Sequence, residues 1–282
     1  MLADFEYVTG LLGDCRKAGW LPLDFIGEEV GREFIIEKLD EADPESQAQR
    51  VVDYVAAADK RYDPLSLWNF QDSYVEMLVE KIGLRNLFAP VCEQYHVALG
   101  NARGFSSINM RVELLLRLAR WQAEGKRCAV LYCGDHDVAG RRISTSLRSN
   151  RDALVYALKL NYPDTRNFDL DDVDIVRFGL NADFIRKHGL LWTDNLVTGS
   201  GKDLGDPEHR SHWDHDVQAY IKEFGRKKVE GDALVTRPQA GRALCEAAIL
   251  RYVDPNGIVK FERAVRRERK QMRAALDRLL GR

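Results

Sequence analysis

The chain has 282 residues, of which 45% are hydrophobic and 30% charged. This composition argues against a disordered chain and allows one large domain or two of ordinary size. The sequence contains no run of 18 apolar residues and no secretory signal at its start, so we expect a cytoplasmic protein without a membrane span. The five cysteines form no C-x-x-C pair, which argues against a zinc site or a disulfide framework.

The net charge of −2 conceals an uneven distribution along the chain. Residues 1–60 contain 14 acidic and 6 basic side chains, whereas residues 255–282 contain 9 basic and 3 acidic ones. On the helix expected at the C-terminus, Arg266 and Lys270 share one face with further basic residues. That face could bind DNA phosphates, or it could be solvated or dock on the acidic segment of a neighbouring subunit.

The first 70 residues are expected to be helical. Helices are predicted at 4–18 and 45–60, and the second of these follows an Asp-Pro pair that suits a helix start. From residue 71 the pattern changes, because strands and helices alternate up to residue 253. The last region, residues 254–282, is predicted to form the basic helix.

The alternating region predicts an α/β fold with a mainly parallel sheet and helices on both faces. Strands are predicted at 74–79, 95–99, 127–133 and 173–178, with a short one at 227–230. Helices are predicted at 81–94, 107–124, 138–148, 182–187, 217–224, 237–252 and 258–280. Residues 194–214 are expected to form a long polar loop, and loops of this length are usually functional.

Acidic residues follow two of the predicted strands. Glu80 comes directly after the first strand, and Asp135 and Asp137 follow the third. Ligands of open α/β sheets bind at the carboxyl ends of the strands, where three carboxylates would suit Mg²⁺ or Mn²⁺. Alternatively, Asp135 caps the next helix while Glu80 and Asp137 are solvated.

These motifs resemble a known family. Val79-Glu80-Lys81 after one strand and Gly134-Asp135-His-Asp137-Val-Ala-Gly140 after another resemble the Toprim domain, the metal-binding module of topoisomerases, primases and related nucleases. The segments that begin at Gln71, Arg103 and Lys228 further resemble the A subunit of topoisomerase VI. Its relatives include the meiotic double-strand-break protein and short, phage-borne homologues. The resemblance extends over residues 4–252.

The resemblance implies Mg²⁺-dependent or Mn²⁺-dependent cleavage of DNA, as in a type IIB topoisomerase or a nicking nuclease. Glu80, Asp135 and Asp137 would be the metal-binding and catalytic residues. It also implies a homodimer, an N-terminal segment derived from a winged helix, and a possible separate ATPase or partner subunit. We expect DNA contacts from the basic residues near these motifs and on the last helix, namely Lys81, Arg103, Arg141, Arg142, Arg266 and Lys270.

The sequence departs from the family at the nucleophile. The family's tyrosine lies in an Arg-x-x-Tyr-Tyr-like helix before the Toprim domain, and the context of Tyr7, Tyr54 and Tyr62 does not match it. A metal-activated water could cleave DNA without a tyrosine. The alternative function is a non-catalytic DNA-binding or complex-assembly protein that retains the Toprim fold.

Overall fold

The computed structural model describes the chain except for residues 1, 23–42, 103–107, 142–150, 199–200 and 282. The chain divides into two units, residues 1–57 and 58–282. The boundary lies before residue 70, the expected end of the N-terminal segment, because residues 58–70 pack with the second unit. Trp68 is fully buried in the core of that unit. Among the described residues, no helix has the length and apolarity that crossing a membrane requires.

The first unit contains helices α1 (Leu2–Lys17) and α2 (Pro44–Ala56). The side chain of Asp43 begins α2, because its Oδ1 accepts hydrogen bonds from the backbone nitrogens of Glu45 and Ser46 at 3.1 and 3.0 Å. This confirms the helix start predicted from the Asp-Pro pair. None of the side chains described in this unit is buried.

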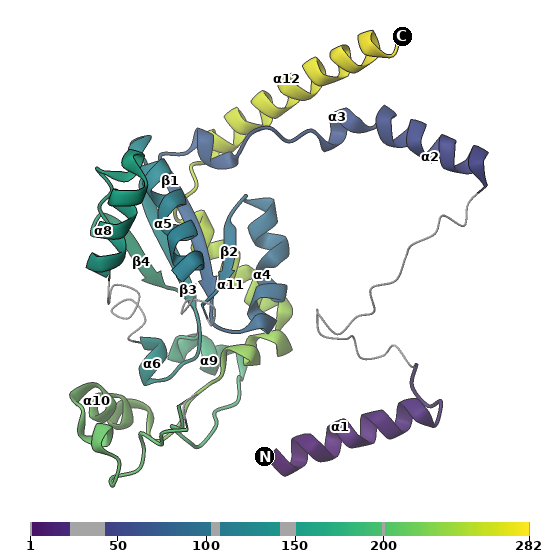
Figure 1. The fold of residues 1–282 in the computed structure, drawn as a ribbon. Coiled ribbons are helices and arrows are strands. Elements are labelled where there is room, and N and C mark those ends of the chain that lie inside the picture. Colours follow the sequence, from purple (N-terminus) through teal and green to yellow (C-terminus); the bar gives the residue numbers. More distant parts are fainter. Residues whose placement is uncertain (1, 23–42, 103–107, 142–150, 199–200, 282) are drawn as a thin grey trace. The chain divides into compact units, whose positions relative to one another are not determined.

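A four-stranded, all-parallel sheet forms the centre of the second unit. Its strands are β1 (Ser73–Val79), β2 (Ala98–Asn101), β3 (Arg127–Cys133) and β4 (Val173–Arg177), in the order β2-β1-β3-β4 (Figure 1). Because β1 and β3 pair over their whole length, their carboxyl ends lie side by side. The predicted α/β class and parallel sheet are therefore confirmed.

Helices cover the sheet on both faces. The chain moves outward through α4 (Ile82–Gln94) from β1 to β2, and returns across β1 through α5 (Ile108–Ala123) to β3. Right-handed connections then require α4 and α5 to lie on opposite faces. Helix α8 (Arg151–Asn161) packs beside α5, and α11 (Pro238–Leu250) packs beside α4. Six of the seven residues in each of β1 and β3 are consequently buried.

Strand β1 carries a charged side chain into this core. Glu76 of β1 is 2% exposed, and its two carboxylate oxygens accept hydrogen bonds from Nε and Nη2 of Arg117, both at 2.8 Å. The hydroxyl of Tyr74 donates a third bond to Glu76 at 2.9 Å, and the Tyr74 ring stacks on Trp121. Burial raises the pKa of Glu76, while Arg117 opposes that change. The pair therefore places a fully bonded carboxylate within the sheet.

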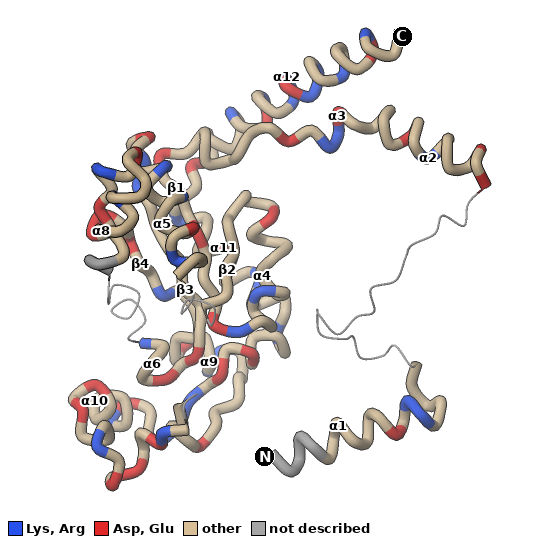
Figure 2. The backbone as a smooth tube through the Cα atoms, in the orientation of Figure 1, with Lys and Arg blue, Asp and Glu red and all other residues tan. Residues whose placement is uncertain are grey.

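The remaining elements are short, except for the last. They are α3 (Ala58–Arg61), α6 (Val138–Arg141), α9 (Ala182–His188), α10 (His215–Phe224), the 3-10 helices η1 (Leu67–Phe70), η3 (Pro163–Thr165), η4 (Arg210–Trp213) and η5 (Gly231–Thr236), and α12 (Pro255–Leu279). Helix α12 packs on η1 and α3, and Figure 2 shows its many Lys and Arg residues.

Some predicted elements were wrong. The second strand spans 98–101 and not 95–99, because Tyr95 ends α4 and His96 turns the chain with a φ of 54°. Residues 227–230 form no strand but two isolated bridges, of Lys228 with Thr193 and of Val229 with His136. Helix α8 was not predicted. The helix predicted at 138–148 is described only as α6, and its remainder lies outside the described residues.

Candidate functional site

The carboxyl ends of β1 and β3 bring Glu80 and Asp135 together. Glu80 follows β1, and its backbone nitrogen donates to the Cys133 carbonyl at 3.0 Å, which continues the pairing of the two strands. Its side-chain Oε2 accepts hydrogen bonds from the Tyr132 hydroxyl and from the backbone nitrogen of Asp135, both at 2.9 Å. Glu80 therefore holds the turn that carries the two aspartates.

Asp135 is a buried carboxylate with partners on both oxygens. Its Oδ1 accepts a hydrogen bond from the Gly231 nitrogen at 2.6 Å, and its Oδ2 lies 3.0 Å from Nζ of Lys81. Burial and the neighbouring charge of Glu80 nevertheless raise the pKa of Asp135 to about 7. Negative charge at this point is thus only partly compensated by the protein.

Asp137 opens the following helix. Its Oδ1 accepts a hydrogen bond from the Gly140 nitrogen at 2.6 Å, which caps α6. Burial raises the pKa of Asp137, and the charge of Glu80 adds to that effect. Helix capping was the alternative expected for Asp135, so the structure gives that role to Asp137.

Two glycines allow this turn to pack so closely. A Cβ atom at Gly134 would collide with the Tyr132 hydroxyl and the Glu80 carboxylate, and one at Gly140 would collide with the Asp135 carbonyl oxygen. Only glycine therefore fits at either position without a shift of the backbone or of the acids.

Lys81 is held among carboxylates. Its Nζ lies 2.7 Å from Oε2 of Glu230 and 3.0 Å from Asp135, and Nζ of Lys228 binds the other Glu230 oxygen at 2.8 Å. Burial opposes the charge of Lys81, but hydrogen bonds to Glu230 and Asp135 outweigh it and raise the pKa of Lys81. Burial likewise opposes the charge of Glu230, yet bonds from Lys228 and Lys81 lower the pKa of Glu230 to about 2. The expected DNA-binding Lys81 is therefore engaged in ion pairs.

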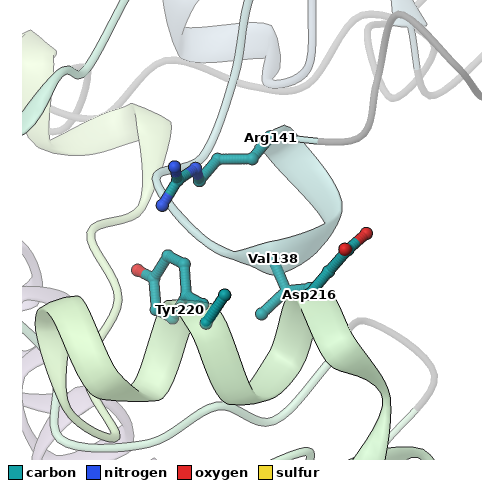
Figure 3. A pocket seen from close by; sticks show the side chains of 5 residues that line it. Val138, Arg141, Asp216 and Tyr220 are labelled. Atoms are coloured by element: carbon teal, nitrogen blue, oxygen red, sulfur yellow. The ribbon is translucent and has the colours of Figure 1, made fainter.

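The side chain of Arg141 lies over two aromatic rings, those of Tyr220 and Phe224, beside the acids. Its guanidinium lies 5.9 and 5.4 Å from the ring centroids of Tyr220 and Phe224, and it pairs with Glu223 at 3.1 Å. Figure 3 shows Arg141 above Tyr220 at the wall of a pocket of about 230 Å³. His136 packs edge-on against Phe224, and burial, followed by the charges of two nearby arginines, lowers its pKa to about 4.

Arg177 is a site residue that the sequence did not single out. It is the last residue of β4 and pairs in register with Tyr132, so it lies at the same edge of the sheet as the acids. Its Nη2 donates to the Asp135 carbonyl at 3.1 Å, while its Nε is buried without a partner. A basic residue at the end of a predicted strand was the available signal.

Of the other predicted DNA contacts, the two that the structure describes are not brought to the acids. Arg103 and Arg142 lie outside the described residues. Arg266 and Lys270 lie on α12, which packs on η1 close to the amino end of β1 (Figure 1). The acids follow the carboxyl end of β1, and the strand between the two ends is about 20 Å long. Arg266 also binds Glu262 at 3.3 Å, whereas Lys270 is exposed.

The donor chemistry of the site fits a hard cation. In the described part of the chain, no three Asp, Glu, His or Cys side chains are placed to ligate one ion together. Mg²⁺, however, usually takes one or two carboxylates and fills its other positions with water and phosphate oxygens. The described residues bond only one oxygen each of Glu80 and Asp137, which leaves the second oxygen of each for a ligand.

Comparison of the chain with protein-family models, with curated proteins and with solved structures finds no match. The assignment of a function therefore depends on the geometry and chemistry of this site. Three features define it: acids at adjacent strand ends, a lysine network behind them and a half-buried arginine beside them.

Proposed function

We propose that this chain is a Toprim-like, metal-dependent DNA-cleaving protein of the topoisomerase VI A-subunit type. The observation that carries the proposal is the meeting of Glu80, Asp135 and Asp137 at the carboxyl ends of two adjacent parallel strands. Ligands of open α/β sheets bind at that edge. The pKa of Asp135 is raised to about 7, in part by the neighbouring charge of Glu80. Negative charge is therefore unfavourable at this edge, and a bound cation would neutralise it.

Each acid has a defined part in this proposal. Glu80 and Asp137 would hold Mg²⁺ or Mn²⁺ through their unbonded oxygens. Asp135, whose two oxygens are bonded by Gly231 and Lys81, would add negative charge beside the ion on losing its proton. The bound ion would polarise a phosphodiester and acidify a water molecule. Lys81 and Lys228 keep Asp135 and Glu230 in place, so the acids are positioned before DNA arrives. A homodimer, and an ATPase or other partner subunit, stay part of the proposal through the family resemblance alone.

Incubation of supercoiled plasmid with the purified protein tests this function. We expect nicked or linear DNA with Mg²⁺ or Mn²⁺, none with EDTA, and none from Asp137→Asn. Asp174→Asn is the matched control, because Asp174 is an exposed aspartate on β4 that pairs with Arg127 away from the acids. Protein attached to the DNA ends in gels run without protease would show that a tyrosine is the nucleophile.

A second candidate is a non-catalytic DNA-binding or complex-assembly protein. It is favoured by the hydrogen bonds of Glu80 Oε2, which fix Tyr132 and the Asp135 backbone as a purely structural carboxylate would. The variant Glu80→Gln separates the two functions. Metal-dependent cleavage lost with DNA affinity unchanged favours the enzyme, whereas DNA binding without any metal dependence or cleavage favours the binding module.

A further inference from the structure

Arg177 is a half-buried cation whose charge has no carboxylate partner among the described residues. Its one hydrogen bond there runs from Nη2 to the neutral carbonyl of Asp135, and its Nε lies buried with no acceptor. Taking a guanidinium out of water is costly, so buried arginines are normally paired with a carboxylate or with an anionic ligand. The fold thus maintains an unfavourable arrangement at the edge of the sheet where the acids gather.

The surrounding chain fixes this arginine in place. The residues after β4 pack so closely on β3 that a Cβ atom at Gly179 would collide with the Cys133 sulfur. The next residue, Leu180, is fully buried and has a φ of 47°, a conformation that a leucine rarely adopts. Strained backbone of this kind persists where the surrounding structure imposes it, and it is concentrated at functional sites. Arg177 is therefore followed directly by a closely packed turn with one strained residue.

Nearby charges indicate what Arg177 would bind. Arg177 interacts electrostatically with Asp137 without forming an ion pair, whereas both Lys81 and Lys228 are occupied by Glu230. Arg141, the other described cation beside the acids, pairs with Glu223, so among the described residues at this edge Arg177 is the cation without an ion pair. Guanidinium groups bind phosphate oxygens through charge-assisted hydrogen bonds. Within the described residues Arg177 bonds only through Nη2, so its Nη1 is left for a phosphate oxygen while its Nε stays buried.

We propose that Arg177 binds a non-bridging oxygen of the DNA phosphate that is cleaved at this site, opposite the acids that hold the metal. This inference rests on the proposed function for the identity of the phosphate. Arg177 would compensate the charge that develops on the phosphate oxygens during attack, and the phosphate would replace the missing partner of the arginine.

The test compares Arg177→Met and Arg177→Lys with wild type, using Arg127→Met as the matched control. Arg127 is an exposed arginine at the amino end of β3. We expect Arg177→Met to slow metal-dependent plasmid cleavage by about 10²- to 10³-fold, as for loss of one donor to a developing charge. With Ca²⁺ in place of Mg²⁺, its affinity for a short fluorescent duplex should depend less on salt, with the slope of log K against log[salt] smaller by about 0.9.

Thermal unfolding distinguishes a binding role from a structural one. Because Arg177 carries an uncompensated charge, Arg177→Met should unfold at the same temperature as wild type or at a higher one. Unfolding of this variant at a lower temperature, with normal DNA binding in Arg177→Lys, would overturn the proposal. Cleavage and salt dependence equal to those of Arg127→Met would overturn it as well.

A second arm uses inorganic phosphate, so that failure of the proposed function can be recognised separately. We expect phosphate to raise the unfolding temperature of wild type and of Arg127→Met but not of Arg177→Met. If phosphate stabilises the proteins in this way but none of them binds DNA, the proposal that DNA is the substrate is overturned, whereas Arg177 is retained as a phosphate-binding residue. DNA cleavage that needs Asp137 but not Arg177 would retain the proposed function and overturn this inference.

Discussion

Asp135→Asn should change how the stability of the protein depends on pH. Burial and the charge of Glu80 raise the pKa of Asp135 from 3.8 to about 7 in the folded protein. The folded state therefore binds this proton more tightly than the unfolded chain. Protonated Asp135 therefore contributes to the free energy of unfolding at low pH, and this contribution is lost as the pH rises through about 7.

The magnitude follows from the two pKa values. At 1.36 kcal/mol per pKa unit, their difference corresponds to about 4 kcal/mol between the extremes of pH. Between pH 5.5 and 8, where few other carboxylates titrate, wild type should lose about 2 kcal/mol relative to Asp135→Asn. Solvent screening should reduce this value only slightly, because the side chain of Asp135 is only 7% exposed. Hydrogen bonds changed by the asparagine add an offset that is constant with pH.

Urea unfolding of both proteins at several pH values measures this difference. Asp174→Asn is again the control, since its exposed carboxylate loses little water on folding. A difference between wild type and Asp135→Asn that stays constant from pH 5.5 to 8 would refute the argument. Asp135 would then be ionised throughout, and the compensation by Lys81 and Gly231 would be complete.

Three further changes have defined outcomes. Arg117→Met leaves the Glu76 carboxylate buried without its two strongest bonds, so the free energy of unfolding should fall by about 3 kcal/mol at neutral pH and by less in acid, as measured in urea. Gly140→Ala forces a Cβ atom against the Asp135 carbonyl and should cost about 1–3 kcal/mol in the same assay. Lys270→Gln should lower the salt dependence of DNA binding, by a slope of about 0.9, and leave the cleavage rate at saturating DNA unchanged, because α12 lies away from the acids.

The sequence indicates the centre of the sheet well because β1 and β3 are nearly continuous apolar runs. Such runs are typical of parallel strands that are buried on both faces. Once these strands are assigned, the rule that ligands bind at carboxyl ends selects Glu80 and the two aspartates. The short edge strand β2 lacks this signal, since all four of its residues are only partly buried, and its predicted position was wrong.

Other parts of the site depend on contacts between residues far apart in the chain. The ion pair of Lys81 with Glu230 joins positions 149 residues apart, and local spacing cannot predict it. The role of Arg177 requires the register of β4 against β3, which brings it beside Tyr132. Helix α8 was missed because Leu154 and Leu158, one turn apart, give a weak periodic signal.

Binding of Mn²⁺ is the most immediate test of a metal site at Glu80 and Asp137, since electron paramagnetic resonance counts the free ion without DNA or turnover. We expect wild type and Asp174→Asn to bind Mn²⁺, and Glu80→Gln and Asp137→Asn to bind it more weakly. Affinity should also increase from pH 6 to pH 8, because loss of the Asp135 proton adds a negative charge beside the ion. Absence of Mn²⁺ binding, or equal binding by all four proteins, would contradict the assignment of these acids as a metal site.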